Sequence, residues 1–415
     1  MKKKILMGLI LVSVCLLTGC FNQKTPEIKK YSDYDDLMDN LKKDTEDEKL
    51  TCWYAEQSDK DWLSDLAKKF QKEYGIEVEL VHYDGVSLFE DMNRANLDGS
   101  GPDVYFCEND QLELARNSGM AVANENLDAD FLKKYYPDTA INAISFQGKT
   151  YGYPVYFDTY CFVYDKELLQ SAPASMEDIL AFSDDYSDTG LTKAILRWDV
   201  SDPYINTMFL AANANIFGEN GDDASQFEIV NDQTVAAMKY FNSISEYMWM
   251  DKSNISHDIV KQRIEDNTLI MGLCKSDILS VVNNEDSTYQ ITYVPSLTKD
   301  MASKPYSTTY IAMVNPYGKE NIGNMFAAYV SIKHPELQYE GNGKLPVINQ
   351  KDGFDEKQSI IYAQYLNSTP VPKVMILGDY MNESAIAFDA IWEGKDVETQ
   401  LSSLQEKMDA IIKEN

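Results

Sequence analysis

The stretch from Gly148 to Leu169 surrounds one carboxylate, Asp158, with tyrosine and phenylalanine rings. An unpaired buried charge is costly, so a carboxylate kept among rings indicates a binding surface. Aromatic rings pack against the C–H faces of sugars and against ammonium groups, and carboxylates accept hydrogen bonds from hydroxyls or attract cations. We expect Asp158, and Tyr156 close to it, to contact a ligand. Two simpler roles stay open: core packing for most of the rings and a backbone hydrogen bond for Asp158.

The elements that would hold this stretch begin with a strand–helix–strand–helix–strand series over residues 50–107. Such a series gives a parallel sheet with helices on both faces. In these sheets ligands bind beyond the carboxyl ends of the strands. Two of those ends are Glu56-Gln57-Ser58 and Glu108-Asn109-Asp110, and Gln57, Ser58 and Asp110 are the candidate contacts there. Asp110 also follows a strand where a helix N-cap would stand, so capping is the alternative to ligand contact.

A second α/β unit is predicted after the aromatic stretch. Residues 194–198, 268–274 and 290–294 are apolar, strand-like runs with helical patterns between them. Trp198 ends the first of these strands and is a candidate ring for stacking on a ligand. Asp202 precedes a proline, a pair typical of a helix start, so Asp202 is either an N-cap or a ligand contact.

The N-terminus has the pattern of an export signal. Lysines precede an apolar run, Ile5–Leu17, that is too short to span a membrane as a mature helix. The run ends in Leu17-Thr18-Gly19-Cys20, which resembles the lipobox of bacterial lipoproteins and implies cleavage before Cys20 and diacylation of its thiol. We therefore expect residues 1–19 to be a signal peptide and residues 20–48 a lipid-anchored polar spacer. The mature protein would then lie outside the cytoplasm, on the outer face of the cell membrane.

Charge and motifs exclude several function classes. The formal net charge of −30 repels phosphate backbones, so we expect no nucleic-acid partner. Three histidines leave little material for a histidine-based metal site, and we expect no metal and no cofactor. The chain also lacks a G-x-S-x-G nucleophile elbow, an H-E-x-x-H pair, a P-loop and a C-x-x-C motif. Binding is therefore favoured over catalysis.

The cysteines that follow Cys20 are Cys52, Cys107, Cys161 and Cys274. Export permits disulfides, and four cysteines allow three pairings. Each of these residues lies in an apolar, strand-like context, which favours buried free thiols that behave as small hydrophobic side chains.

Four blocks of the sequence resemble the solute-binding proteins of ABC importers, of the maltose-binding type. The blocks are FQKEYGIEV at 70–78, GPDVYF at 101–106, the aromatic stretch with its YDKELL end, and Asp202-Pro203-Tyr204. This resemblance implies a two-lobed α/β fold of the periplasmic-binding-protein kind (type II, Venus-flytrap). Each lobe of that fold is a mainly parallel sheet flanked by helices.

The family template also implies how the chain is divided. Lobe 1 would comprise residues 49–156 plus 305–339, and lobe 2 residues 157–297 plus 344–415. The chain crosses between the lobes at a hinge, and the lobes close around a ligand bound between them. ABC permease subunits are the implied partners, and we expect the receptor to be a monomer.

Site positions carry over from the family as well. Asp110 falls on a carboxylate that accepts hydroxyl hydrogen bonds in sugar-binding members, and Asp158 on an acidic residue at the crossover. Taken from the residues and from the resemblance together, the candidate ligand contacts are Asp110, Asp158, Tyr156, Asp202, Tyr204, Trp198, Gln57, Ser58 and Tyr380.

This chain departs from the family pattern at positions that bear on the ligand. Cys107 stands where the family has an aromatic residue, and Gln111 stands where an arginine is common. Residues 275–277 replace a G-P-W turn that supplies a stacking ring. These losses argue against a long maltodextrin and leave the family resemblance intact.

We therefore predict an extracellular lipoprotein that binds a mono- or oligosaccharide between its lobes and delivers it to an ABC importer. The same acidic and aromatic lining would suit a polyamine or another cationic solute, which is the alternative within the binding class. A glycoside hydrolase that uses Asp110 with Asp158 or Asp202 as its acid–base pair is the alternative from the enzyme class.

Overall fold

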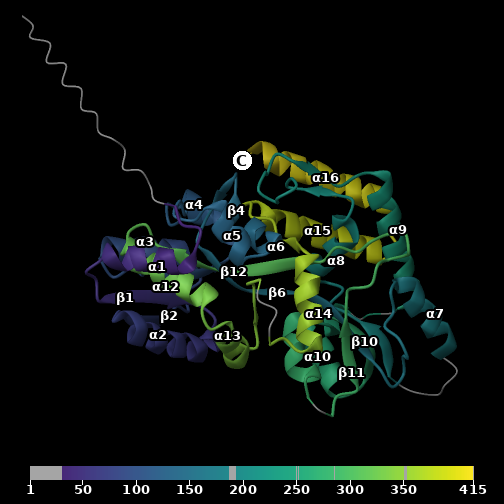
Figure 1. Ribbon diagram of the computed structural model, residues 1–415. Helices are drawn as coiled ribbons and strands as arrows, with labels where there is room; N and C mark the ends of the chain where they lie inside the picture. Colours follow the sequence, from purple (N-terminus) through teal and green to yellow (C-terminus); the bar gives the residue numbers. More distant parts are fainter. Residues whose placement is uncertain are drawn as a thin grey trace, which may run out of the picture.

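Two α/β lobes lie side by side and share the long strand β6 (Tyr153–Asp165), which passes from one lobe to the other (Figure 1). The computed structural model describes residues 30–186, 193–248, 250, 252–284, 286–349 and 353–414. The predicted signal peptide and the lipidation site Cys20 lie outside these residues. The first half of β6 pairs antiparallel with β12 (Tyr306–Val314), and its second half pairs with strands of the other lobe.

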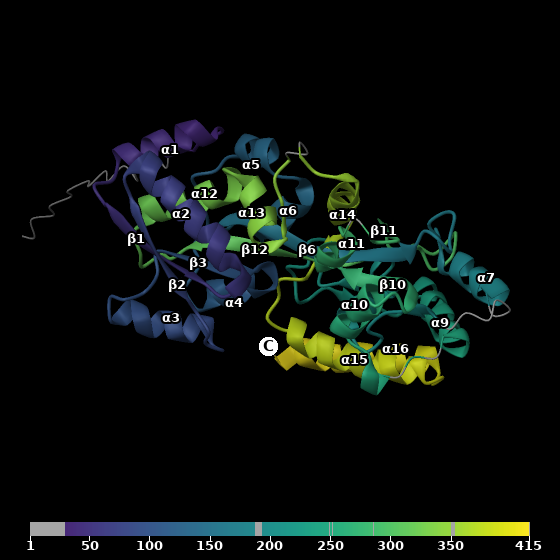
Figure 2. The ribbon, with the colours of Figure 1, turned by 90° about the horizontal axis from the view of Figure 1, so that it is seen from below.

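The first lobe is built on the strand order β2-β1-β3-β12-β6 and lies at the left in Figures 1 and 2. Strands β1 (Lys49–Tyr54), β2 (Glu77–His82) and β3 (Val104–Glu108) are parallel, and β12 is antiparallel to β3. Helix α2 (Lys60–Tyr74) buries Trp62, Leu63, Leu66 and Phe70 at helical spacing, and Gly75 ends it with a φ of 74°. Only a residue without a Cβ adopts that left-handed conformation at low cost.

The second lobe is built on the other half of β6. Strands β10 (Leu269–Lys275) and β11 (Tyr289–Thr292) pair antiparallel with β6, and β7 (Ala194–Arg197) pairs parallel with β10. Helix α8 (Pro203–Ala211) begins at an aspartate cap and packs against α9 (Asp232–Tyr247). It also packs against α15 (Leu377–Trp392), which in turn packs against α16 (Val397–Glu414).

The remaining helices cover the sheets of the two lobes. Helix α1 (Tyr34–Lys43) packs on α12 (Glu320–Ile332), and α13 (Pro335–Asn342) packs on α2. The others are α3 (Leu88–Leu97), α4 (Leu112–Asn117), α5 (Ala129–Tyr135), α6 (Asp138–Ala143), α7 (Met176–Tyr186), α10 (His257–Glu265), α11 (Leu279–Val282) and α14 (Glu356–Leu366).

Short strands and 3₁₀ turns complete the chain. The strands are β4 (Ser145–Phe146), β5 (Lys149–Thr150), β8 (Asn215–Ile216), β9 (Phe227–Glu228), β13 (Leu345–Pro346) and β14 (Thr369–Pro370). The 3₁₀ turns are η1 (Gln57–Asp59), η2 (Asn109–Gln111), η3 (Lys252–Asn254) and η4 (Ser276–Ile278). Turns η2 and η4 follow strands β3 and β10 directly, so they lie at the strand ends where ligands bind in sheets of this kind.

The predicted two-lobed α/β fold is confirmed. Parallel pairs occur in β2-β1-β3, in β10-β7 and between β12 and the short strand β14, and the crossing strands β6 and β12 add antiparallel pairs. Cys52, Cys107, Cys161 and Cys274 are free and buried, as the sequence favoured. Over the described residues, no helix combines the length and the apolar character needed to cross a membrane.

A buried lysine ties together three segments that are distant in the sequence. Lys373, which precedes α15, is fully buried. Its Nζ donates to the backbone oxygen of Asn142 at 3.1 Å, to Oδ1 of Asn142 at 2.8 Å and to the backbone oxygen of Asn220 at 2.5 Å. These acceptors are neutral, so burial lowers the pKa of Lys373 to about 8, although the charge of Asp222 opposes the shift.

The pH dependence of stability tests this buried charge through Lys373→Met, which removes the ammonium and keeps most of the apolar stem. Folded Lys373 releases its proton near pH 8 and an unperturbed lysine near 10.5, so the unfolded chain binds more protons between these values. The unfolding free energy of the wild type should therefore rise relative to that of the variant, by about 2 kcal/mol between pH 8 and pH 10. Urea unfolding measured at both pH values checks the difference, and parallel pH profiles for the two proteins would show that the lysine is not buried as a charge.

Candidate functional site

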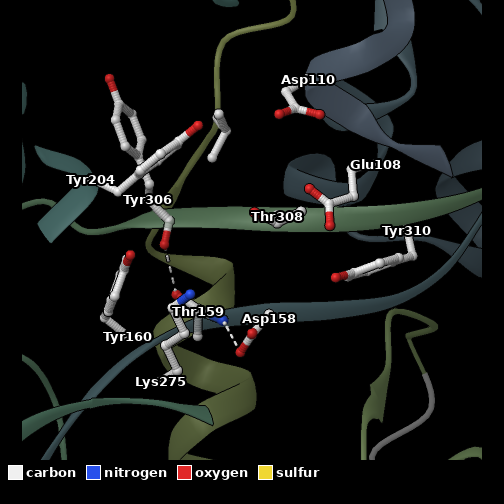
Figure 3. A pocket seen from close by; sticks show the side chains of 11 residues that line it. Glu108, Asp110, Asp158, Thr159, Tyr160, Tyr204, Lys275, Tyr306, Thr308 and Tyr310 are labelled. Atoms are coloured by element: carbon white, nitrogen blue, oxygen red, sulfur yellow. Dashed lines mark hydrogen bonds between the residues drawn. The ribbon is translucent and has the colours of Figure 1, made fainter. Parts of the chain in front are cut away.

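A cavity of about 240 Å³ lies where β3, β6, β10, β12 and α8 meet, between the two lobes (Figure 3). Both lobes contribute to its wall, because β3 belongs to the first sheet while β10 and α8 belong to the second lobe. The residues that line it are Glu108, Asp110, Asp158, Thr159, Tyr160, Tyr204, Lys275, Tyr306, Thr308, Tyr310 and Val371.

The floor of this interlobe pocket is the β6–β12 strand pair. Tyr306, Thr308 and Tyr310 alternate along β12, so their side chains share one face of the strand. Asp158 lies opposite Thr308 in the antiparallel register, and Tyr160 follows two residues later on the same face of β6. The pairing register therefore places three phenol rings and a carboxylate on a single surface.

Asp158 is held as a carboxylate by partners from two other segments. The Oγ and the backbone N–H of Ser276 donate to Oδ1, the latter at 3.3 Å, and Nζ of Lys344 lies 3.7 Å from Oδ2. Burial raises the pKa of Asp158, but Lys344 and Ser276 outweigh it, and the pKa lies below its usual value. The N–H of Thr159 also donates to Asp158 at 3.0 Å, so the backbone-bonding role and the pocket-lining position coexist.

Asp110 and Glu108 stand at the opposite end of the pocket from Lys275 (Figure 3). Asp110 lies inside η2 and is not the N-cap of α4, a position that Gln111 occupies without a side-chain bond. Its Oδ1 is buried and has no hydrogen-bond partner. Burial, followed by the charge of Glu108, raises the pKa of Asp110 to about 7, and burial raises the pKa of Glu108 as well. The unpartnered oxygen of Asp110 is therefore free to accept a donor from outside the chain, while Glu108 beside it also has a hydrogen bond with Tyr310.

Tyr156 lies beside the pocket, on the same face of β6 as Asp158. It is fully buried, its ring stacks on that of Tyr310 with centroids 4.4 Å apart, and its hydroxyl donates to Asp59 at 2.8 Å. Asp59 in turn accepts from Nε1 of Trp62 at 3.0 Å. Tyr156 therefore fixes the ring of Tyr310; it lines the adjoining cavity of the first lobe and not the interlobe pocket itself.

Asp202 lies behind the wall of the pocket, at the start of α8. It accepts from the backbone N–H of Tyr204 at 2.8 Å, as an N-cap, and its Oδ2 lies 2.6 Å from Nε2 of His257. Tyr160 donates to the same oxygen at 3.3 Å. Burial raises the pKa of Asp202, but His257 outweighs it, and the pKa lies below its usual value. The capping role is confirmed, and it positions Tyr204 in the pocket.

Four other candidates from the sequence do not reach the interlobe pocket. Trp198 is fully buried, donates from Nε1 to Asn206 at 3.3 Å and packs against Phe209 and Trp392. Tyr380 is also fully buried, with its hydroxyl 3.3 Å from Oγ1 of Thr207. Both rings fill the core between α8 and α15, which corrects the expectation that they stack on a ligand. Gln57 and Ser58 lie exposed on η1. They line neither this pocket nor the larger cavity of the first lobe that is described below.

Sequence reasoning missed several lining residues, among them Tyr306, Thr308 and Tyr310. Their period-two spacing was visible in the sequence, but the face that such a strand presents depends on its pairing register with β6. Glu108 belongs to the strand end that the sequence marked, but only Asp110 of that end was expected to contact a ligand.

A second cavity, of about 730 Å³, opens beside the pocket in the first lobe and shares Glu108 and Tyr310 with it. Asp59, Tyr83, Phe106 and Leu114 are among its lining residues. This second cavity therefore continues the interlobe pocket towards α3 and α4.

A pocket lined from both lobes of a two-lobed α/β chain is the arrangement of a binding protein that closes around a small solute. Residues 65–331 match the family described as bacterial extracellular solute-binding protein, and the chain belongs to that family.

Curated relatives cover almost the whole chain. It is similar to the maltooligosaccharide ABC transporter solute-binding lipoprotein of Streptococcus pneumoniae (strain ATCC BAA-255 / R6), at 23% identity over 96% of this chain and 94% of the relative. It is also similar to the maltodextrin-binding protein MdxE of Bacillus subtilis (strain 168), at 24% identity over 87% of this chain and 88% of the relative.

Solved structures share the fold. An extracellular solute-binding protein from Staphylococcus aureus in complex with maltose matches with a TM-score of 0.79 and 19% identity, over 89% of this chain and 99% of that one. MalX from Streptococcus pneumoniae in complex with maltopentaose matches with a TM-score of 0.72 and 18% identity, over 87% of this chain and 100% of that one.

The variant Asp110→Asn tests whether the ionised carboxylate of Asp110 destabilises the ligand-free protein. The pKa of Asp110 is raised from 3.8 to about 7 in the folded chain, so the folded state binds more protons between these values and loses stability as the pH rises. The unfolding free energy of the ligand-free variant, measured relative to that of the wild type, should therefore be about 2 kcal/mol higher at pH 8 than at pH 5. Chemical unfolding at both pH values measures this gain, with Asp84→Asn, at an exposed loop position, as the control. A variant that is less stable than the wild type at pH 8 would contradict the assignment.

Proposed function

We propose that this chain is an extracellular lipoprotein that captures a carbohydrate between its two lobes and delivers it to an ABC importer. The observation that carries the proposal is the interlobe pocket, where phenol rings and carboxylates from both lobes face one cavity. Rings that cover the apolar face of a sugar and carboxylates that accept from its hydroxyls are what carbohydrate recognition requires. The two curated relatives are named for maltooligosaccharides and maltodextrin, and these names support a carbohydrate ligand.

Closure would follow from where the contacts lie. In this proposal lobe 1 comprises residues 49–156 plus 305–339 and lobe 2 residues 157–297 plus 344–415, with Asp110 and Tyr204 on opposite sides. A ligand that touches both lobes binds the closed form better than the open form, and only such a difference in affinity can shift the equilibrium between them. Asp158, on the shared strand β6, would contact the same ligand from the floor.

The ligand contacts that we propose are Asp110, Asp158 and Tyr204 from the sequence, joined by Glu108, Tyr160 and Tyr310 from the structure. Asp202 acts through its neighbour, since it caps the helix that presents Tyr204, and Tyr156 stacks on Tyr310 while lining the adjoining cavity. The adjoining cavity in the first lobe offers room for further sugar units.

Anchoring and delivery complete the proposal. Cleavage before Cys20 and diacylation of its thiol would tether the receptor to the outer face of the membrane through the polar spacer that follows. The receptor would work as a monomer and dock on permease subunits, without a metal or a cofactor.

We further propose that the chain binds its sugar without cleaving it. Asp110 and Asp158 face one cavity, as the acid–base pair of a glycoside hydrolase would. Neighbouring residues instead hold Asp158 ionised by hydrogen bonds and an ion pair, which suits a fixed acceptor. Labelled oligosaccharides incubated with the protein should remain intact, and turnover that Asp158→Asn abolishes would overturn the receptor function.

A thermal-shift screen of mono- and disaccharides, followed by titration calorimetry, tests the proposal. Binding to the folded state alone raises the melting temperature in proportion to the logarithm of ligand concentration over Kd. Tyr204→Ala and Asp158→Asn should each weaken binding of the best sugar by about tenfold or more, because they remove a stacking ring and a charge-assisted acceptor.

Matched controls separate this loss from a general effect. Tyr247→Ala and Asp84→Asn remove the same side chains at exposed positions and should leave Kd within twofold. Binding of a sugar that neither pocket variant weakens would place the ligand elsewhere, and a screen in which no sugar raises the melting temperature would refute the carbohydrate ligand.

A further inference from the structure

The charges around the interlobe pocket are unevenly compensated. At the Asp158 end, Lys344 lies 3.7 Å from the carboxylate and Ser276 donates to it. Asp202, behind the wall, is paired with His257 at 2.6 Å. Lys275 also lines this end of the pocket. The chain thus supplies cations and donors for the carboxylates on the lobe 2 side.

The carboxyl groups at the other end are less well compensated. Among the described residues, neither Glu108 nor Asp110 takes part in an ion pair, and Oδ1 of Asp110 has no hydrogen-bond partner although it is buried. Burial raises the pKa of Glu108 and outweighs a hydrogen bond with Tyr310 and the charge of Lys275, which lower it. Burial likewise outweighs the backbone hydrogen bonds that lower the pKa of Asp110. Figure 3 shows both carboxyl groups turned into the pocket, across from the rings of Tyr204 and Tyr306.

Two half-buried carboxyl groups, two positions apart at one strand end, repel each other when both are ionised, and burial raises the pKa of each. A neutral sugar would bring hydroxyl donors but no charge to offset them. A protonated amine brings both, because an ammonium group has three N–H donors and a positive charge that interacts strongly in a partly desolvated site.

We propose that the ligand is a carbohydrate that carries a free amino group, and that Glu108 and Asp110 bind this group as an ammonium. The proposal rests on the proposed function and specifies its ligand. A sugar ring fits the pocket of about 240 Å³ better than a polyamine does, because the end opposite the carboxyl pair carries Lys275, which would repel a second ammonium. Tyr204 and Tyr306 then face the C–H side of the ring.

Matched sugars at one pH test the proposal directly. Disaccharides of the α-1,4 and β-1,4 series are titrated at pH 6.5 in three forms: with a free amino group, with that group N-acetylated, and with a hydroxyl in its place. Spermidine is titrated beside them. The free-amine form should bind at least about tenfold tighter than both of its counterparts, because acetylation and hydroxyl replacement each remove the charge.

Variants at the carboxyl pair tie the preference to these residues. Glu108→Gln combined with Asp110→Asn keeps the shape of both side chains, and it should reduce the ratio of the affinities for the amine and hydroxyl forms to about one. Asp84→Asn, an exposed position, removes a carboxylate and should leave the ratio unchanged. The melting temperature of each ligand-free variant confirms that it is folded.

Each outcome decides between the two proposals. Equal or tighter binding of the hydroxyl form overturns the amino-sugar ligand and leaves the carbohydrate function standing. A preference for the amine that survives in the double variant overturns the role of Glu108 and Asp110. Spermidine bound tighter than every sugar, or no binding by any of the sugars, overturns the carbohydrate function and this inference with it.

Discussion

The antiparallel pairing of β6 with β12 is the interaction on which the rest of the structure depends. β6 leaves the first sheet, pairs with β12 through Thr159, and pairs from Tyr160 onwards with β10 of the second lobe. Its register places Thr308 opposite Asp158 and alternate tyrosines of β12 on one face. A slip of one residue would turn those tyrosines to the other face of the sheet and remove the floor of the pocket.

The acidic residues in and around this pocket differ in how well other groups of the chain compensate their charges. Asp158 and Asp202 have partners within the chain and lowered pKa values, so both are held ionised: Asp202 caps α8, and Asp158 lines the pocket as a fixed acceptor. Asp110 has a buried oxygen without a partner and a pKa raised to about 7. A protein that bound nothing here would gain stability by losing that carboxyl group. The presence of Asp110 therefore indicates that its destabilising effect is offset by a role in ligand recognition.

Local sequence signals predicted much of the fold because they depend on neighbours in the chain. The apolar face of α2, its Gly75 terminus and the Asp202 cap all follow from spacing and backbone chemistry. The same reasoning selected Asp110 and Asp158 as pocket residues. It failed for Trp198 and Tyr380. The sequence shows that each position carries a large ring, but it does not show that α8 and α15 pack together and bury both rings. The tyrosines of β12 were missed for the related reason that strand register is a property of two distant segments.

The central claim is that one solute contacts both lobes at this pocket, and a crystal structure of the protein with the best-binding sugar tests it most directly. We predict electron density for the sugar between Asp110 and Tyr204, above Asp158, in a form whose lobes close on it. Density confined to one lobe, for example in the cavity around Asn124 and Asn324, would contradict the account.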